Sequence, residues 1–146
     1  LSIGYPTLEN QLKIIQAQRY TNPLLELQPV TNAQNVIEVQ NYLNSVRMTD
    51  AVLCYAIQLC EATREHPLVE LGISPRGVYA LVKMARASAV LKGRNYIVPE
   101  DIQNVFCDVC AHRMVLRPQA RVEGVSAEYL LRDVMNRIKP PTASSR

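Results

Sequence analysis

Tryptophan is absent from this chain of 146 residues, and Phe106 is its only phenylalanine. A single domain of this length therefore needs an aliphatic core, with tyrosine as the main aromatic contribution. No apolar run approaches the roughly 20 residues that a membrane-spanning helix needs, so we expect no membrane span. The first residues show no basic segment followed by an apolar stretch. A secretory signal is therefore not indicated, and we expect a cytoplasmic protein.

Glycine is also scarce, with only five residues available to cradle a phosphate group. Gly72 and Gly77 have the spacing of a P-loop. However, Val78 and Tyr79 stand where Lys and Ser or Thr must contact phosphate and Mg²⁺. The two histidines lack the partners of a catalytic constellation. We therefore expect that the chain does not hydrolyse ATP by itself.

Four cysteines are too few for a disulfide scaffold. A zinc site would have to combine Cys107, Cys110 and His112 with Cys54, and further ligands at zinc spacing are missing. The alternative is that Cys107 and Cys110 lie on one helical face beside Phe106 as small buried apolar side chains. We favour that alternative and expect no metal and reduced thiols.

Positive charge is concentrated in the middle of the chain. Residues 1–73 carry a net charge of −3, residues 74–121 carry +5, and residues 122–146 carry +1. A positive segment of this size predicts an anion close to it. One alternative function is therefore a stand-alone helical module that binds nucleic acid or adapts one protein to another through residues 74–121.

Arg113, Arg117 and Arg121 are the residues that a nucleic-acid module would use, because their four-residue spacing could follow phosphates. Pro118 interrupts that helix, and no set of base-reading side chains accompanies the arginines. No large apolar stripe is left over for a protein adaptor. We therefore expect no nucleic-acid partner.

Helical periodicity dominates the sequence and predicts an all-α fold, a compact bundle of about six helices. The predicted helices begin at Thr7, Asn32, Thr49, Ser74, Pro99 and Ser126. The residues predicted to face inward include Val36, Val39, Leu43 and Val46 in the second helix and Val52, Tyr55, Ala56, Leu59 and Thr63 in the third. Extended segments are expected only near residues 27–30 and 95–98. Residues 140–146 are expected to form a flexible tail.

The clearest start signal is Ser74 followed by Pro75, because serine is favoured at the N-cap and proline at the first helical position. Arg76 follows in the first turn, where the helix dipole does not favour a cation. Two interpretations remain open. Arg76 binds an anion together with the free amides of this turn, or it is a solvated side chain that pairs with Glu70.

An ordered set of short motifs runs through the chain. The motifs are Ala62-Thr63-Arg64-Glu65-His66-Pro67, Leu71-Gly72-Ile73-Ser74-Pro75-Arg76, Ala85-Arg86-Ala87, Gly93-Arg94-Asn95-Tyr96-Ile97-Val98-Pro99-Glu100-Asp101-Ile102, His112-Arg113 and Val122-Glu123-Gly124-Val125-Ser126. In this order they resemble the C-terminal lid domain of MoxR-type AAA+ ATPases, over about residues 1–140. The resemblance implies that residues 1–6 end a link from an ATPase core and that residues 7–139 form the helical lid. The chain would then be a fragment of a longer parent, with the Walker motifs upstream of Leu1.

The resemblance also implies roles for particular residues. Arg76 would be the sensor-two arginine, which reaches the γ-phosphate of ATP held with Mg²⁺ by the parent's core, and Ser74 and Pro75 would position it. Ile73 departs from the small residue usual at its place, which would alter the packing against adenine. The isolated fragment would be neither catalytic nor cofactor-binding. The parent would be an ATPase in a homo-hexameric ring, a chaperone-like machine that assembles or activates an unidentified client complex.

Overall fold

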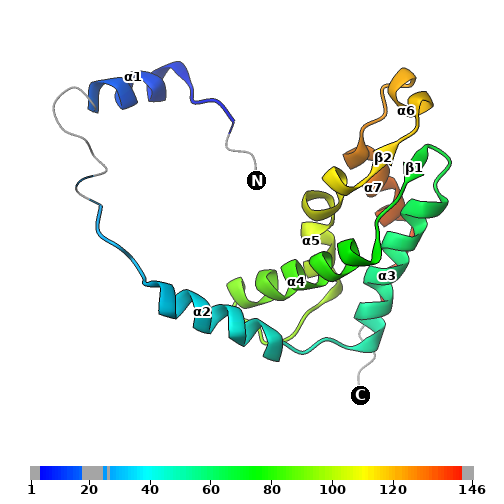
Figure 1. The fold of residues 1–146 in the computed structure, drawn as a ribbon, viewed down its shortest axis with the longest axis horizontal. Helices are drawn as coiled ribbons and strands as arrows, with labels where there is room; N and C mark the ends of the chain where they lie inside the picture. Colours follow the sequence, from blue (N-terminus) through cyan, green and yellow to red (C-terminus); the bar gives the residue numbers. More distant parts are fainter. Residues whose placement is uncertain (1–3, 18–24, 26, 143–146) are drawn as a thin grey trace. The chain divides into compact units, whose positions relative to one another are not determined.

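The computed structural model describes residues 4–17, 25 and 27–142, and it confirms the all-α fold class (Figure 1). The chain divides into two units, residues 1–39 and residues 40–146. The described residues contain no helix that is both long enough and apolar enough to cross a membrane.

The first unit contains α1 (Leu8–Ala17) and most of α2 (Ala33–Tyr42). Both helices begin where predicted, because the backbone N–H of Asn10 donates to Thr7 Oγ1 at 3.4 Å and that of Asn35 donates to Asn32 Oδ1 at 2.9 Å. Every described residue between 4 and 39 is exposed. The prediction of a short strand-like segment at residues 27–30 is wrong, because none of these residues lies in a strand.

The prediction of a continuous inward face in the second helix is also wrong. Val36 and Val39 are 45% and 53% exposed. The α-helix ends at Tyr42, and Leu43–Ser45 forms the 3₁₀ turn η2, which breaks the helical spacing. Val46 is buried, but it belongs to the connection that follows.

The second unit is a bundle of α3 (Asp50–Glu65), α4 (Pro75–Leu91), α5 (Pro99–Cys110) and α7 (Ala127–Arg137). Helix α5 packs against the other three (Figure 1). The core of the second unit consists of aliphatic side chains around Tyr55 and Phe106, as the composition predicts. The five residues predicted to face inward in α3 are all buried.

The unit also contains elements that the sequence did not predict. Helix α6 (Pro118–Val122) raises the number of α-helices in the described residues to seven, against about six predicted. Strands β1 (Val69–Leu71) and β2 (Val115–Leu116) pair antiparallel, with an irregular register. The extended segment predicted at residues 95–98 forms a single parallel bridge, between Tyr96 and Arg47. Elements of two to five residues are too short to show a period.

Asp101 joins the end of α4 to the start of α5 and is fully buried. Its carboxylate accepts two hydrogen bonds from Arg94, at 2.6 and 2.7 Å. It also accepts one from Lys92 Nζ and one from the backbone N–H of Val98, both at 3.1 Å. Burial by itself would raise the pKa of Asp101, but the hydrogen bonds from Arg94, Val98 and Lys92 outweigh it and lower the pKa to about 2.

Candidate functional site

The candidate site is the start of α4, which begins where the sequence predicts. Ser74 is the N-cap residue, and its carbonyl and hydroxyl oxygens accept from the backbone N–H of Gly77 at 2.8 and 3.4 Å. Pro75 occupies the first helical position. Arg76 therefore lies in the first turn, and its side chain is exposed.

Two residues in the last turn of α3 form hydrogen bonds with Ile73, the residue that precedes the N-cap Ser74. The backbone N–H of Ile73 donates to Thr63 Oγ1 at 3.0 Å, and the carbonyl oxygen of Ile73 accepts from Arg64 Nε at 2.7 Å. The Thr63 hydroxyl in turn donates to the carbonyl of Cys60 at 2.6 Å. Thr63 and Ile73 are both buried. Two motifs that are separate in the sequence thus form one structure that fixes where α4 begins.

Gly72 and Gly77 permit this close packing. A Cβ atom at Gly72 would lie 2.7 Å from the backbone of Arg64, and one at Gly77 would lie 2.5 Å from Ile73 Cγ2. The P-loop-like spacing of the two glycines therefore reflects contacts within the bundle. Ile73 is fully buried, so its size acts on the first turn of α4 rather than on an exposed surface.

Arg76 takes part in no hydrogen bond or ion pair among the residues that the structure describes. The pairing with Glu70 that the sequence left open is therefore not seen. An exposed guanidinium with no partner among residues 4–17, 25 and 27–142 is available to a ligand.

We predict that Thr63→Val destabilises the second unit and loosens the start of α4. Valine keeps the shape of the side chain but removes the acceptor of the Ile73 N–H, and an unpaired buried donor costs about 1–3 kcal/mol. For a unit of this size, each kcal/mol lowers the melting temperature by roughly 4–8 °C. Circular dichroism during thermal unfolding measures the melting temperatures of the wild type and Thr63→Val.

Hydrogen exchange at residues 73–78 provides the second measurement, and these amides should exchange faster in Thr63→Val. Thr142→Val, at an exposed position, is the control and should change neither quantity. Unchanged exchange at residues 73–78 in Thr63→Val would show that Thr63 does not position α4.

The arginines of the nucleic-acid alternative do not form a free stripe. Arg117 donates from Nε to the carbonyl of Val69 at 3.1 Å, and Arg113 donates to the carbonyl of Val109. Pro118 begins α6 between the second arginine and the third. Two of the three guanidinium groups therefore serve the fold, which disfavours this alternative.

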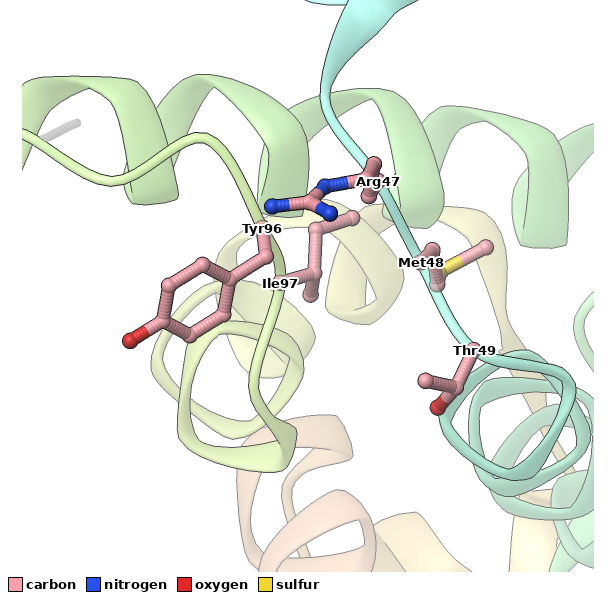
Figure 2. Close-up of a pocket in the computed structure, with 5 residues that line it drawn as sticks. All are labelled: Arg47, Met48, Thr49, Tyr96 and Ile97. Carbon is pink, nitrogen blue, oxygen red and sulfur yellow. The ribbon is translucent and has the colours of Figure 1, made fainter. Parts of the chain in front are cut away.

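A shallow hollow of about 560 Å³ lies elsewhere on the second unit (Figure 2). Figure 2 shows Tyr96 and Ile97 on one side, Met48 and Thr49 on the other, and the guanidinium of Arg47 directed toward Tyr96. The parallel bridge between residues 47 and 96 joins the two segments that line the hollow. It contains none of the predicted site residues, and sequence reasoning could not find it because its sides lie about fifty residues apart.

The cysteines fit the interpretation as buried side chains only in part. Cys110 is buried, Cys107 is half-buried and Cys54 is exposed. Cys110 lies against Cys60 of α3, and this hydrogen-bonded contact together with burial raises the pKa of the Cys110 thiol. Within the described ranges, no three His, Cys, Asp or Glu side chains converge as metal ligands.

Comparison with known proteins identifies the family. The AAA lid domain model matches residues 61–134. YeaC of Bacillus subtilis, itself uncharacterised, is 38% identical over 99% of this chain and 45% of its own length. The chaperone MoxR1 of Mycobacterium tuberculosis is 25% identical over 99% of this chain and 40% of its own length.

A solved structure supports the same family assignment. A protein from Cytophaga hutchinsonii, assigned as an ATPase, matches 96% of this chain with a TM-score of 0.86 and 26% identity. The match covers 45% of that protein, so this chain spans less than half the length of each of these three relatives.

The chain belongs to the AAA lid domain family. Within that family it is a lid domain of the MoxR type, as the ordered motifs predicted.

Proposed function

We propose that this chain is the lid of a longer MoxR-type AAA+ ATPase and closes over ATP bound to the core of the same polypeptide. Residues 1–6 end the link from that core, and residues 7–139 form the lid. The parent assembles into a ring, a homo-hexamer, and acts as a chaperone-like machine that assembles or activates a client complex. The isolated chain is not catalytic.

In this proposal Arg76 is the sensor-two arginine. A guanidinium forms strong, charge-assisted hydrogen bonds with phosphate oxygens, and it stabilises the negative charge that spreads over a phosphoryl group during transfer. The observation that carries the proposal is the exposed Arg76, which has no hydrogen-bond or ion-pair partner in the described part of the chain and lies on a first turn fixed by Thr63 and Arg64. Ser74 and Pro75 direct that turn.

The proposal assigns Mg²⁺ to the core of the parent. A magnesium ion prefers carboxylate oxygens and water at octahedral positions, and the described residues bring no three candidate ligands together. Mg²⁺ would neutralise charge on the bound phosphates. This chain would contribute the arginine and a rigid cover that excludes water.

Hydrogen exchange in the full-length polypeptide tests the proposal. A slowly hydrolysed ATP analogue should slow exchange at residues 74–79 in the full-length protein and leave the isolated chain unchanged, because the core supplies the nucleotide. Residues 127–137 of α7 serve as an internal reference. Equal exchange at residues 74–79 with and without the analogue in the full-length protein would contradict lid closure at this site.

A further inference from the structure

Tyr96 lines two hollows on the second unit, the one of about 560 Å³ in Figure 2 and a second of about 620 Å³. Met48 and Ile97 line the first hollow, and Tyr42 and Val90 line the second. Tyr42 and Tyr96 are 50% and 48% exposed. We call the residues that line the two hollows the Tyr96 surface. An exposed apolar patch that continues over several elements is typical of an interaction site.

The composition of the Tyr96 surface is that of a protein-binding site. Tyrosine, methionine and arginine are enriched in such sites, whereas lysine, glutamate and aspartate are depleted. Of the ten residues that line the two hollows, five are Tyr, Met or Arg, and none is Lys, Glu or Asp. This composition favours a polypeptide as the ligand, and the two arginines favour one that carries negative charge.

Arg94 holds Tyr96 in place. Its Nη1 atom donates to the carbonyl oxygen of Tyr96 at 3.0 Å, and its guanidinium lies 5.7 Å from the centre of the Tyr96 ring, within reach of a cation–π contact. The two hydrogen bonds from Arg94 to the buried Asp101 fix the guanidinium in turn and balance its charge. Tyr96 is therefore a preorganised aromatic anchor, which loses little freedom when a partner binds.

Arg47 supplies the positive charge that no carboxylate of the surface balances. Its backbone is fixed, because its N–H donates to the carbonyl of Asn95 and its carbonyl accepts from the N–H of Ile97, both at 2.9 Å. Its side chain is exposed and forms no ion pair in the described part of the chain. Figure 2 shows the guanidinium directed toward Tyr96. A carboxylate that enters this hollow therefore meets an exposed guanidinium beside an aromatic ring.

We propose that the Tyr96 surface binds an acidic segment of a partner protein, in which a carboxylate side chain lies next to a bulky apolar one. The carboxylate accepts hydrogen bonds from Arg47, and the apolar side chain packs against Tyr96 and Met48. A guanidinium and a carboxylate form a strong, directional pair, which fixes the orientation of the bound segment. One unbalanced guanidinium disfavours nucleic acid, whose binding depends on contacts with several phosphates.

This inference goes beyond the proposed function, because the Tyr96 surface lies away from the start of α4. Val90, which lines the second hollow, follows Arg76 by 14 residues, or about 20 Å along the helix. The Tyr96 surface and Arg76 therefore belong to opposite ends of α4.

NMR titration of the isotope-labelled 146-residue chain with a short peptide tests the proposal. The probe is the peptide Ser-Asp-Leu-Glu-Leu-Ser, acetylated and amidated so that its only carboxylates are on side chains. The amide signals of residues 47–49 and 95–97 should shift, and those of residues 127–137 in α7 should not. A peptide with Asn and Gln in place of the acids, and one with Ala in place of Leu, should each bind at least about tenfold more weakly.

Substitutions on the surface provide the second measurement. Arg47→Glu and Tyr96→Ala should each weaken binding of the acidic peptide at least about tenfold, and Arg47→Lys should weaken it less than Arg47→Glu because it keeps the charge. Arg121→Glu and Tyr129→Ala are the matched controls, at exposed positions outside both hollows. They should bind the peptide like the wild type.

A wild-type chain that does not bind the acidic peptide at up to about 1 mM overturns the proposal. Equal binding of the neutral peptide overturns it as well, and so does an equal loss of affinity in Arg121→Glu and Arg47→Glu. Tighter binding of a single-stranded oligonucleotide at residues 47–49 and 95–97 would assign the surface to nucleic acid instead. None of these outcomes bears on ATP turnover, so the proposed function of Arg76 stands or fails separately.

Discussion

Arg76→Ala in the full-length polypeptide should lower kcat by on the order of 10³-fold and leave the affinity for ATP little changed. The reason is that the proposed contact strengthens only as charge develops on the transferring phosphoryl group. A group that binds the ground state and the transition state equally would change KM instead. Steady-state ATPase kinetics and direct titration with an ATP analogue measure the two quantities.

Arg76→Lys should restore little of this rate, because an ammonium group cannot reproduce the planar guanidinium fork. Neither substitution should change the melting temperature of the isolated chain, since Arg76 is exposed and forms no hydrogen bond or ion pair with the described residues. Arg121→Ala, at another exposed arginine, is the control and should keep full turnover. If Arg76→Ala unfolds the chain but preserves turnover, Arg76 is a structural residue.

Asp101→Asn should destabilise the second unit far more than a substitution at an exposed position does. Removing one partner of a buried ion pair typically costs about 3–5 kcal/mol. The side chains of Arg94 and Lys92 are 22% and 46% exposed, so water compensates them in part. We therefore expect about 2–3 kcal/mol, which lowers the melting temperature by roughly 10–20 °C.

The effect should depend on pH in a defined direction. The pKa of Asp101 is about 2 in the folded chain against an ordinary 3.8, so ionised Asp101 stabilises the fold above about pH 4. That contribution of about 2–3 kcal/mol is lost as the pH falls from 4 toward 2. Urea unfolding of wild type and Asp101→Asn should therefore converge over this range.

Glu100→Gln is the matched control, because Glu100 lies in the same first turn of α5 and is exposed. It should change the free energy of unfolding by less than about 0.5 kcal/mol. A stability difference between wild type and Asp101→Asn that is the same at pH 7 and pH 2 would refute the ion-pair explanation.

The sequence predicted the bundle because its longer helices carry both caps and periodic apolar faces. In α3 and α4 the cap residues Thr49 and Ser74 act as expected, and the inward face of α3 is buried throughout. The second predicted helix forms, but its apolar face does not continue to Val46, because η2 interrupts the helix at Leu43–Ser45. Only the packed structure shows that change of helical geometry.

The site was predicted only in part, for a related reason. Ser74, Pro75 and Arg76 follow from local capping rules and from the resemblance to a family. Ile73 donates to Thr63, ten residues away, and accepts from Arg64, nine residues away. Spacing alone does not reveal these hydrogen bonds.

Helix α4 is held at both ends. Just before its start, Ile73 hydrogen-bonds to α3. Just past its end, Lys92 and Arg94 both hydrogen-bond to Asp101 of α5. Its 17 residues form a stiff rod of about 25 Å. A tilt of about 10° at one end would therefore displace the other end by about 4 Å, enough to break a hydrogen bond. The two anchors prevent such a tilt, so the position of Arg76 relative to α5 depends on the Asp101 ion pair at the far end of the helix.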